Sequence, residues 1–310
     1  MGCGPWAAPP PWWPERGPLG LSTGPAGDVF EAERPRLLGL AYRMLGSLTD
    51  AEDIVQEAWL RWSSVDGDYL DRPQAWLTTV TTRLAIDWLR SGARTREEYV
   101  GPWLPEPVVG EPGPDERAEL ADSLTLGFLT VLDRLEPTER AVFLMADVFS
   151  VPYREIAATV DKSPEACRQI ASRARRRLLG ARQRRAGADR QLVDELLVAL
   201  WLGDMDTVLK RLAPDVVLIT DGGANRRAAR RPVTGGARVG RFLTNLTHRY
   251  RARMSVVPVT VNGEPGILAR LDGEVDFVAA FELDGDRVTT VRLVRNPDKL
   301  RLVDSEVRIT

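Results

Sequence analysis

Apolar residues recur at helical spacing on both sides of one short break between residues 151 and 179. The break is Asp161-Lys162-Ser163, and Ser163 followed by Pro164 is a typical helix start because it supplies a cap and a pre-set φ. The apolar positions before and after the break are Tyr153, Ile156, Ala157 and Val160, then Ala166, Ile170, Ala174 and Leu178. The pattern predicts a helix-turn-helix with helices over residues 153–160 and 164–179.

The second of these helices carries polar and basic residues on the faces that its apolar stripe leaves free. They are Arg168, Gln169, Ser172, Arg173, Arg175, Arg176 and Arg177. Such a helix suits a DNA groove, where Arg side chains reach base edges and phosphates. An ordinary amphipathic hairpin with a solvated basic face has the same pattern, so this stretch alone leaves both interpretations open.

The N-terminal third of the chain predicts three helices after an irregular tail. Residues 1–27 are dense in Pro, Gly and Trp and have no period, which predicts disorder. Helices are expected over residues 28–46, 50–63 and 74–90. Thr49 and Glu52 fit a capping box at the start of the second helix.

The helix over residues 50–63 has one apolar face and one acidic face. The apolar face, expected in a core, holds Ile54, Val55, Ala58, Trp59 and Trp62. Asp53, Gln56, Glu57 and Leu60 share the other face at spacings of three and four. An acidic face with an exposed Leu is usually a solvated surface, and it also suits the docking of a basic partner.

The helix over residues 74–90 is largely apolar, with Trp76 and Trp88 in its stripe, and becomes basic toward its end. The cations are Arg83, Arg90, Arg94 and Arg96. A Trp in such a stripe is most often a core residue. Against melted DNA, an aromatic ring and neighbouring Arg side chains would instead stack on bases and neutralise phosphates.

Residues 94–117 form a Pro- and Gly-rich linker, which the residues before each Pro bias toward extended backbone. Tyr99 and Trp103 lie within it, and a simple spacer needs neither of them. We therefore expect the linker to dock on something. A second helical module follows, with helices over residues 118–132 and 137–147 before the helix-turn-helix.

After Gly187 the pattern changes to helices followed by strands. Helices are expected over residues 190–202, 205–212 and 235–250, and strands over residues 215–220, 254–261, 266–271, 275–283 and 287–294. Asn262-Gly263, Asp272-Gly273 and Asp284-Gly285 separate the last four strands, and such pairs are strong hairpin signals. Helices with an antiparallel meander predict an α+β domain with a curved sheet.

Charge and cysteine content narrow the function. The 310 residues carry a net charge of -2, yet residues 162–185 hold one Lys and eight Arg against Glu165 alone, which indicates a local phosphate contact. Cys3 and Cys167 exclude a disulfide framework and show no metal-ligand spacing, so a reducing cytoplasm is the expected compartment. The chain has neither an apolar run of membrane-spanning length nor a secretory signal pattern.

Several motifs in this order resemble the extracytoplasmic-function (ECF) sigma factors of the sigma-70 family. The stretch Asp50-Ala51-Glu52-Asp53-Ile54-Val55-Gln56-Glu57 is similar to their polymerase-binding helix. Leu135-Glu136-Pro137-Thr138-Glu139-Arg140 and Tyr153-Arg154-Glu155-Ile156-Ala157 are similar to the start of their promoter-binding module. This part of the resemblance covers residues 28–182.

The rest of the chain resembles one subgroup, the ECF41 or SigJ-like factors, which carry a fused SnoaL-like C-terminal domain. Its motifs are Trp103-Leu104-Pro105-Glu106-Pro107 in the linker, Asp221-Gly222-Gly223, and Asn296-Pro297-Asp298-Lys299-Leu300. The subgroup's glycine motif normally runs Asp-Gly-Gly-Gly-Lys, and here Ala224 and Asn225 replace its last two residues. Arg226 and Arg227 are the candidates to replace the missing lysine.

The resemblance implies a multidomain fold: two all-α modules, the second with the helix-turn-helix, and a C-terminal α+β cone domain of the SnoaL-like or NTF2-like kind. The implied parts are a disordered tail (1–27), sigma region 2 (28–93), a linker (94–117), sigma region 4 (118–185) and a regulatory domain (189–305).

The resemblance also implies that the protein binds core RNA polymerase and directs transcription from specific promoters. Docking on the β′ clamp would use Asp50, Asp53, Gln56, Glu57 and Leu60, and region 4 would meet the β flap. Contacts to the melted −10 element would come from Arg83, Trp88, Arg90 and Arg94, with a pocket formed by the loop 66–73. Contacts to the −35 duplex would come from Glu165, Arg168, Gln169, Ser172, Arg173 and Arg176.

The C-terminal domain is expected to regulate by docking on the linker through the three subgroup motifs. The sole histidine, His248, has no acid–base partner beside a nucleophile, so we expect no catalytic residue, cofactor or metal. Two alternatives stay open: a duplex-DNA-binding regulator outside the holoenzyme, and a SnoaL-like isomerase or cyclase with a DNA-binding appendage. Whether a small-molecule ligand occupies the C-terminal pocket is also open.

Overall fold

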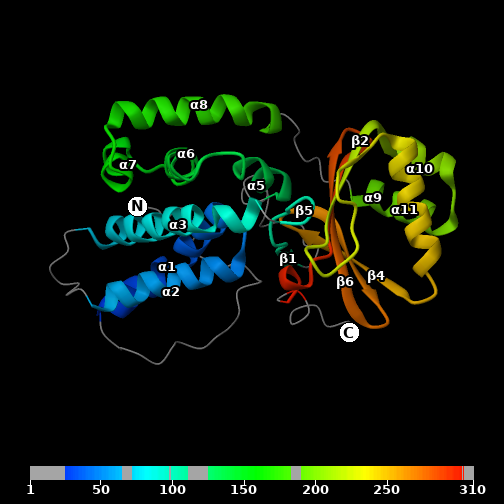
Figure 1. Cartoon of the computed structure of the whole chain (residues 1–310), viewed down its shortest axis with the longest axis horizontal. Helices are drawn as coiled ribbons and strands as arrows, with labels where there is room; N and C mark the ends of the chain where they lie inside the picture. The colour runs from blue at the N-terminus through cyan, green and yellow to red at the C-terminus, as the bar shows by residue number, and fades with distance from the viewer. Residues whose placement is uncertain are drawn as a thin grey trace. The chain divides into compact units, whose positions relative to one another are not determined.

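The computed structural model describes residues 25–64, 72–97, 99–110, 125–182, 190–301 and 303. It divides into two compact units (Figure 1). The first comprises residues 1–94 and 131–180, and the second comprises residues 95–130 and 181–310. Most of the tail 1–27 and of the loop 66–73 lies outside the described residues.

The first unit is helical. Its elements are α1 (Pro25–Leu45), α2 (Leu48–Ser63), α3 (Pro73–Glu97), α6 (Pro137–Phe143), the π-helical turn η2 (Leu144–Val148), α7 (Tyr153–Val160) and α8 (Pro164–Arg182). Helices α1 and α2 pack on each other through residues that are buried, among them Leu37, Ala41, Val55 and Ala58. The expected helix 137–147 passes into a π-helical turn after Phe143, and of the expected helix 118–132 the structure describes α5 (Leu126–Leu132).

Helix α2 starts two residues earlier than the sequence pattern predicts, and the Thr49–Glu52 capping box is wrong. Ser47 is the N-cap: its backbone is extended and its side chain accepts a 3.2 Å hydrogen bond from the Asp50 amide. Gly46, with φ of 70°, reverses the chain after α1 and places Ser47 there. The predicted apolar face is confirmed for four residues, while Trp59 is partly buried, its ring centroid 4.8 Å from that of Phe30.

The helix-turn-helix is confirmed as α7 and α8. Asp161 ends α7 in the left-handed region, with φ of 52°, and the Ser163 hydroxyl accepts a 3.1 Å hydrogen bond from the Ala166 amide. The buried stripe of α8 consists of Cys167, Ile170, Ala171, Ala174 and Leu178. The expectation that Ala166 belongs to it is wrong, because the stripe facing α7 begins one residue later, at Cys167.

The second unit is built on a seven-stranded sheet of order β1-β4-β5-β6-β7-β2-β3. Its strands are β1 (Val109–Gly110), β2 (Leu212–Asp221), β3 (Val233–Thr234), β4 (Met254–Val261), β5 (Glu264–Leu271), β6 (Glu274–Asp284) and β7 (Arg287–Val294). Its helices are α9 (Arg190–Leu202), α10 (Met205–Arg211), α11 (Gly236–Tyr250) and the 3-10 turn η3 (Pro297–Lys299). The start of α5 also belongs to this unit.

The antiparallel meander over β4–β7 is confirmed. Asn262-Gly263 and Asp272-Gly273 form its first two turns, with positive φ at all four residues, as two-residue hairpins of type I′ require. The third turn is Gly285-Asp286, because Asp284 still pairs with Arg287, so the predicted Asp284-Gly285 is off by one residue. The pattern did not predict that β2 runs parallel to β7, or that β1 of the linker pairs with β4.

The sheet is buried on both faces. Helices α9, α10 and α11 cover one face (Figure 1), packing on Phe277, Ala279 and Phe281 of β6. The intervening Val278 and Ala280 face the other side, where they meet Leu104, Val109 and Leu126. The alternation of side chains along β6 thus separates a helix-covered face from a linker-covered face. No helix among the described residues is long and apolar enough to cross a lipid bilayer.

Candidate functional site

The carboxylate of Asp221, at the end of β2, is fully buried and receives four donors. Its Oδ1 accepts from the Tyr99 hydroxyl at 2.5 Å and from the Gly223 amide at 3.0 Å. Its Oδ2 accepts from the Leu104 amide at 2.9 Å and from the Lys299 ammonium at 2.7 Å. Two donors therefore come from the linker, one from the turn after β2 and one from the C-terminal motif.

The two glycines after Asp221 are required by the space around them. A Cβ on Gly222 would lie 2.4 Å from the Arg226 carbonyl oxygen, and a Cβ on Gly223 would lie 2.7 Å from Asn296 Cγ. Gly223 also has φ of 57°, which glycine adopts at least cost. Only glycine therefore lets the chain turn back so tightly under the Asn296 side chain.

Ala224 and Asn225, which depart from the subgroup motif, are exposed beyond this turn. The cation on Asp221 is Lys299, while Arg226 lies 3.8 Å from Asp276. The cation beside Asp221 thus comes from the Asn-Pro-Asp-Lys-Leu motif, and the replacement of the missing lysine by Arg226 or Arg227 stays a prediction.

Lys299 and Asn296 hold the linker from the opposite side. Lys299 donates to the Leu104 carbonyl as well as to Asp221, and its ammonium lies 4.2 Å from the Trp103 ring centroid. Asn296 donates to the Tyr99 hydroxyl at 2.8 Å. Burial and the hydrogen bond to Asp221 both raise the pKa of Tyr99 above its ordinary value. The phenol thus stays a donor.

The linker continues along the sheet beyond this cluster. Leu104, Pro105, Glu106 and Pro107 are all buried. The Val108 amide donates to the Asn262 side chain, and the Asn262 amide donates to the Val108 carbonyl, both at 2.9 Å. Strand β1 then pairs with β4, Val109 opposite Val261. We term these contacts of residues 99–110 with Asp221, Asn262, Asn296 and Lys299 the linker clamp.

Two of the predicted motif residues contribute little to the clamp. Pro297 begins η3, and the Asp298 side chain is exposed and pairs with Arg301. Only the Asp298 amide is used, as it donates to Asn296 Oδ1 at 3.1 Å and so fixes the orientation of the amide that holds Tyr99.

A second buried charge cluster lies under the start of α5, and the sequence did not reveal it. Glu264 is buried on β5 and accepts a hydrogen bond from the Leu126 amide. Burial raises the pKa of Glu264 to about 7; nearby Arg292 opposes the shift, and Glu282 adds to it. Arg292 donates to Glu282 at 2.8 Å. One feature of the sequence could have indicated it: Glu264 directly follows the Asn262-Gly263 turn, at the start of a strand whose faces are both buried.

Gly127 allows α5 to rest on this cluster. A Cβ at that position would lie 3.0 Å from the Arg292 guanidinium nitrogen. The C-terminal domain thus holds Tyr99 of the linker through Asp221 and Leu126, at the start of α5, through Glu264.

The residues expected to dock on polymerase share one outward face of α2. Asp53, Gln56 and Leu60 are exposed, and Asp50 and Glu57 are partly exposed. Leu60 is 54% exposed, a large fraction for a leucine, and Glu57 pairs with Arg61 at 3.0 Å. The structure therefore brings this predicted set together.

Two of the four residues expected at the −10 element contact the second helical module. Arg83 of α3 donates to the carbonyls of Thr159 and Ala158, at 2.9 and 2.8 Å, at the C-terminus of α7. Arg90 donates to Thr138 at 3.3 Å. Trp88 is partly buried, and the Arg94 side chain lies outside the described residues.

The residues expected at the −35 element all lie on the exposed side of α8: Glu165, Arg168, Gln169, Ser172, Arg173 and Arg176. Arg168 pairs with Glu165 at 3.2 Å. Two other arginines of this helix are structural: Arg175 binds Asp147 at 2.8 Å and Arg177 binds Glu139 at 2.7 Å. The basic residues of α8 thus form two groups. One group lies on the exposed side of the helix, and the other attaches the helix to the rest of the module.

No group of His, Cys, Asp and Glu side chains in the described part of the chain has the arrangement of a metal site. His248, the sole histidine, is exposed near the end of α11.

Comparisons with known proteins identify the family of the two helical modules. The family descriptions "Sigma-70 region 2" and "Sigma-70, region 4" match residues 29–95 and 126–178. The ECF RNA polymerase sigma factor SigJ of Mycobacterium tuberculosis is 40% identical over 87% of this chain and 91% of its own length. The probable factor SigI of the same species is 32% identical over 91% of this chain and 97% of its own.

The crystal structure of M. tuberculosis SigJ superposes with a TM-score of 0.72 and 36% identity, covering 89% of this chain and 98% of that one. Both helical modules and the C-terminal sheet domain are included in this coverage. The chain therefore belongs to the extracytoplasmic-function sigma factors of the sigma-70 family.

Proposed function

We propose that the protein binds core RNA polymerase and directs transcription initiation at specific promoters, and that its C-terminal domain modulates this activity through the linker clamp. Family membership supports the first part, and the four-donor site at Asp221 supports the second. We assign no catalytic step to the chain, because the relatives are sigma factors.

The exposed acidic face of α2, centred on Leu60, is the proposed surface for the β′ clamp of polymerase. An apolar side chain surrounded by acidic groups offers both contact area and electrostatic steering toward a basic partner. Region 4, with the exposed side of α8, is proposed to meet the β flap and the −35 duplex. Arg83 and Arg90 are proposed for the melted −10 element.

Arg83 has to leave its present partners before it can contact DNA. The carbonyls of Ala158 and Thr159 carry the partial negative charge of the α7 C-terminus, which favours a guanidinium there. We therefore interpret the described arrangement of the helical unit as the form that precedes promoter binding. Binding of a DNA phosphate would replace these carbonyls as the partner of Arg83.

The clamp is proposed to set how region 2 and region 4 are linked. Residues 99–110 and Leu126 are held by one rigid sheet, so the segment between the two promoter-binding modules follows a fixed path at both ends. A freely moving linker would instead allow many separations between the modules. The clamp thus favours promoters with one spacing between the −35 and −10 elements.

Asp221→Asn is expected to broaden the range of spacings that the protein accepts. The Asn side chain is neutral, and in either orientation its NH2 group would face two of the four present donors; removing one partner of a buried ion pair costs about 3–5 kcal/mol. The measurement is reconstituted transcription with core polymerase on a promoter selected from genomic fragments, with its spacer shortened or lengthened by one or two base pairs.

The matched control is Asp215→Asn, the same change at an exposed position of β2. It should keep the wild-type dependence on spacer length. Identical spacer profiles for the wild type and Asp221→Asn would show that the clamp does not act on promoter geometry.

Arg168→Ala and Arg176→Ala are expected to have different effects on −35 recognition. Arg168 lies near the start of α8, so its loss should cost about 1–3 kcal/mol at one base position and relax the preference there. Arg176 lies two turns further on and should weaken all sequences alike. Transcription from a −35 library measures both, and an unchanged base preference in Arg168→Ala would exclude that residue from base reading.

Glu264→Gln is expected to remove a pH dependence of stability. In the folded protein the pKa of Glu264 is about 7, whereas in the unfolded chain it is near 4.5. Between these pH values the native state binds more protons, so stability falls as pH rises, by up to about 1.4 kcal/mol per pH unit at the steepest point. Above the pKa of Glu264 in the folded protein, stability no longer falls because of this group.

The measurement is the free energy of urea unfolding from about pH 3.5 to about pH 8, a range that brackets both pKa values. Glu264→Gln should flatten the decline, and Glu274→Gln, the same change at an exposed position of β6, should leave it intact. Parallel curves for the wild type and Glu264→Gln would contradict the raised pKa.

A further inference from the structure

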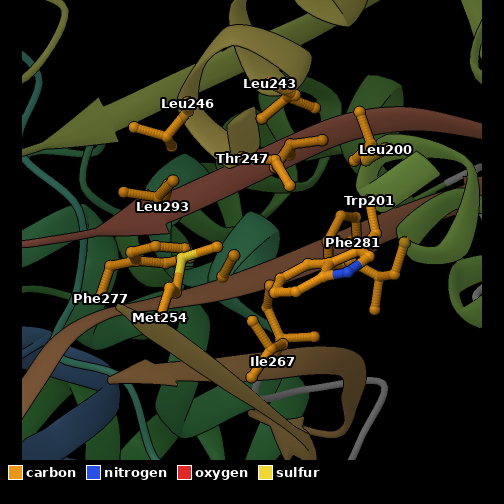
Figure 2. Close-up of a pocket in the computed structure, with 14 residues that line it drawn as sticks. Leu200, Trp201, Leu243, Leu246, Thr247, Met254, Ile267, Phe277, Phe281 and Leu293 are labelled. Atoms are coloured by element: carbon orange, nitrogen blue, oxygen red, sulfur yellow. The ribbon is translucent and has the colours of Figure 1, made fainter. Parts of the chain in front are cut away.

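A cavity of about 90 Å³ lies between the sheet and helices α9 and α11 of the C-terminal domain. Figure 2 shows the side chains that surround it, among them Trp201, Leu243, Leu246, Phe277, Phe281 and Leu293. Nearly all of its lining is hydrocarbon or aromatic. Thr247 and Trp201 are the lining residues whose side chains carry an N–H or O–H group.

This lining determines the chemical class of an occupant. Among the residues that the structure describes, no charged side chain lines the cavity, so a charged molecule would lose its hydration without a compensating partner. An apolar cavity of roughly 150 Å³ in another protein stays dry and binds benzene. The present cavity, at about 90 Å³, is smaller and therefore suits at most a single small ring or a short branched chain. A larger substrate of an isomerase or cyclase does not fit.

One wall of the cavity is formed by α9. Trp201 lines it and is nevertheless 41% exposed, so this side chain lies between the cavity and solvent. Val198 and Leu202, three residues before and one after Trp201, are also exposed. An apolar molecule thus meets an apolar surface at the point where it would enter.

The cavity and the linker clamp lie on opposite faces of the same strands. On β6, Phe277, Ala279 and Phe281 line the cavity, while Val278 and Ala280 pack in the cluster that contains Leu104. On β7, Leu293 lines the cavity and the next residue, Val294, belongs to the linker cluster. A change in the packing of one face is therefore transmitted through a shared backbone to the other.

We propose that this cavity binds a small uncharged apolar molecule, and that the bound molecule strengthens the linker clamp by stabilising β6 and β7. The site would make the sigma factor responsive to such a molecule. The second half of the proposal rests on the proposed regulatory role of the clamp, whereas binding in the cavity does not.

The test uses the full chain and fluorobenzene as the probe, followed by ¹⁹F NMR. Fluorobenzene is expected to bind the wild type, and 4-fluorobenzoate, which adds a charge to the same ring, is expected not to bind. Leu246→Trp should fill the cavity and abolish binding. Asn245→Trp adds the same indole at the neighbouring exposed position of α11 and should leave binding intact.

Thr247→Val is a second variant that preserves side-chain shape and guards against misfolding of Leu246→Trp. It removes a polar group from the lining and should tighten fluorobenzene binding several-fold. Three results would overturn the site. The first is that fluorobenzene does not bind the wild type, and the second is that a folded Leu246→Trp protein binds it as well as the wild type does. The third is that 4-fluorobenzoate binds as well as fluorobenzene.

The effect on the clamp is read from hydrogen exchange of residues 99–108 in the same samples. At a probe concentration near ten times its Kd, linkage slows exchange by up to about tenfold if release of the linker requires an empty cavity. Binding without a change in linker exchange would overturn the coupling. If Asp221→Asn leaves the spacer profile unchanged, the proposed role of the clamp fails, but fluorobenzene binding to the cavity is not affected. The two proposals therefore fail separately.

Discussion

A buried carboxylate is the constraint on which the C-terminal unit depends. Asp221 is fully enclosed, and an ion in such a place is tolerated only when its lone pairs are occupied and its charge is balanced. Its four donors come from the linker, from the glycine turn and from Lys299. Segments far apart in the sequence are therefore required to fold together. Opening of the linker would leave Asp221 paired with Lys299 and without Tyr99 and Leu104.

This arrangement makes the linker part of the regulatory domain while it remains the connection between the two promoter-binding modules. Two states follow, one with the linker held and one with it released, and any interaction that differs between them shifts their populations. In the proposed function, polymerase, promoter DNA and an occupant of the apolar cavity each act on this balance. The regulator would then be carried in the same chain as the sigma factor.

The sequence predicted most elements, because helical periods, Asx-Gly turns and Pro-rich segments are local signals. The residues of the clamp motifs were predicted by the resemblance to the SigJ-like subgroup and not by a local pattern. The sequence did not predict β1, the parallel pairing of β2 with β7, or the cluster of Glu264, Arg292 and Glu282, which depend on tertiary contacts. Ser47 replaced Thr49 as a cap because Gly46 set the turn. Arg83 was predicted to contact DNA. In the structure it donates to the Thr159 carbonyl of α7, a tertiary contact that no local pattern encodes. The functional assignments of the −10, −35 and polymerase residues remain proposals.

Hydrogen exchange of the free full-length protein tests the clamp most directly. The account predicts slow exchange at the Leu104 amide and at Val108–Gly110 in the wild type. Exchange at Leu104 should become fast in Asp221→Asn, while β5 and β6 keep their protection. Fast exchange over residues 99–110 in the wild type, or equal protection of Leu104 in both proteins, would contradict the account.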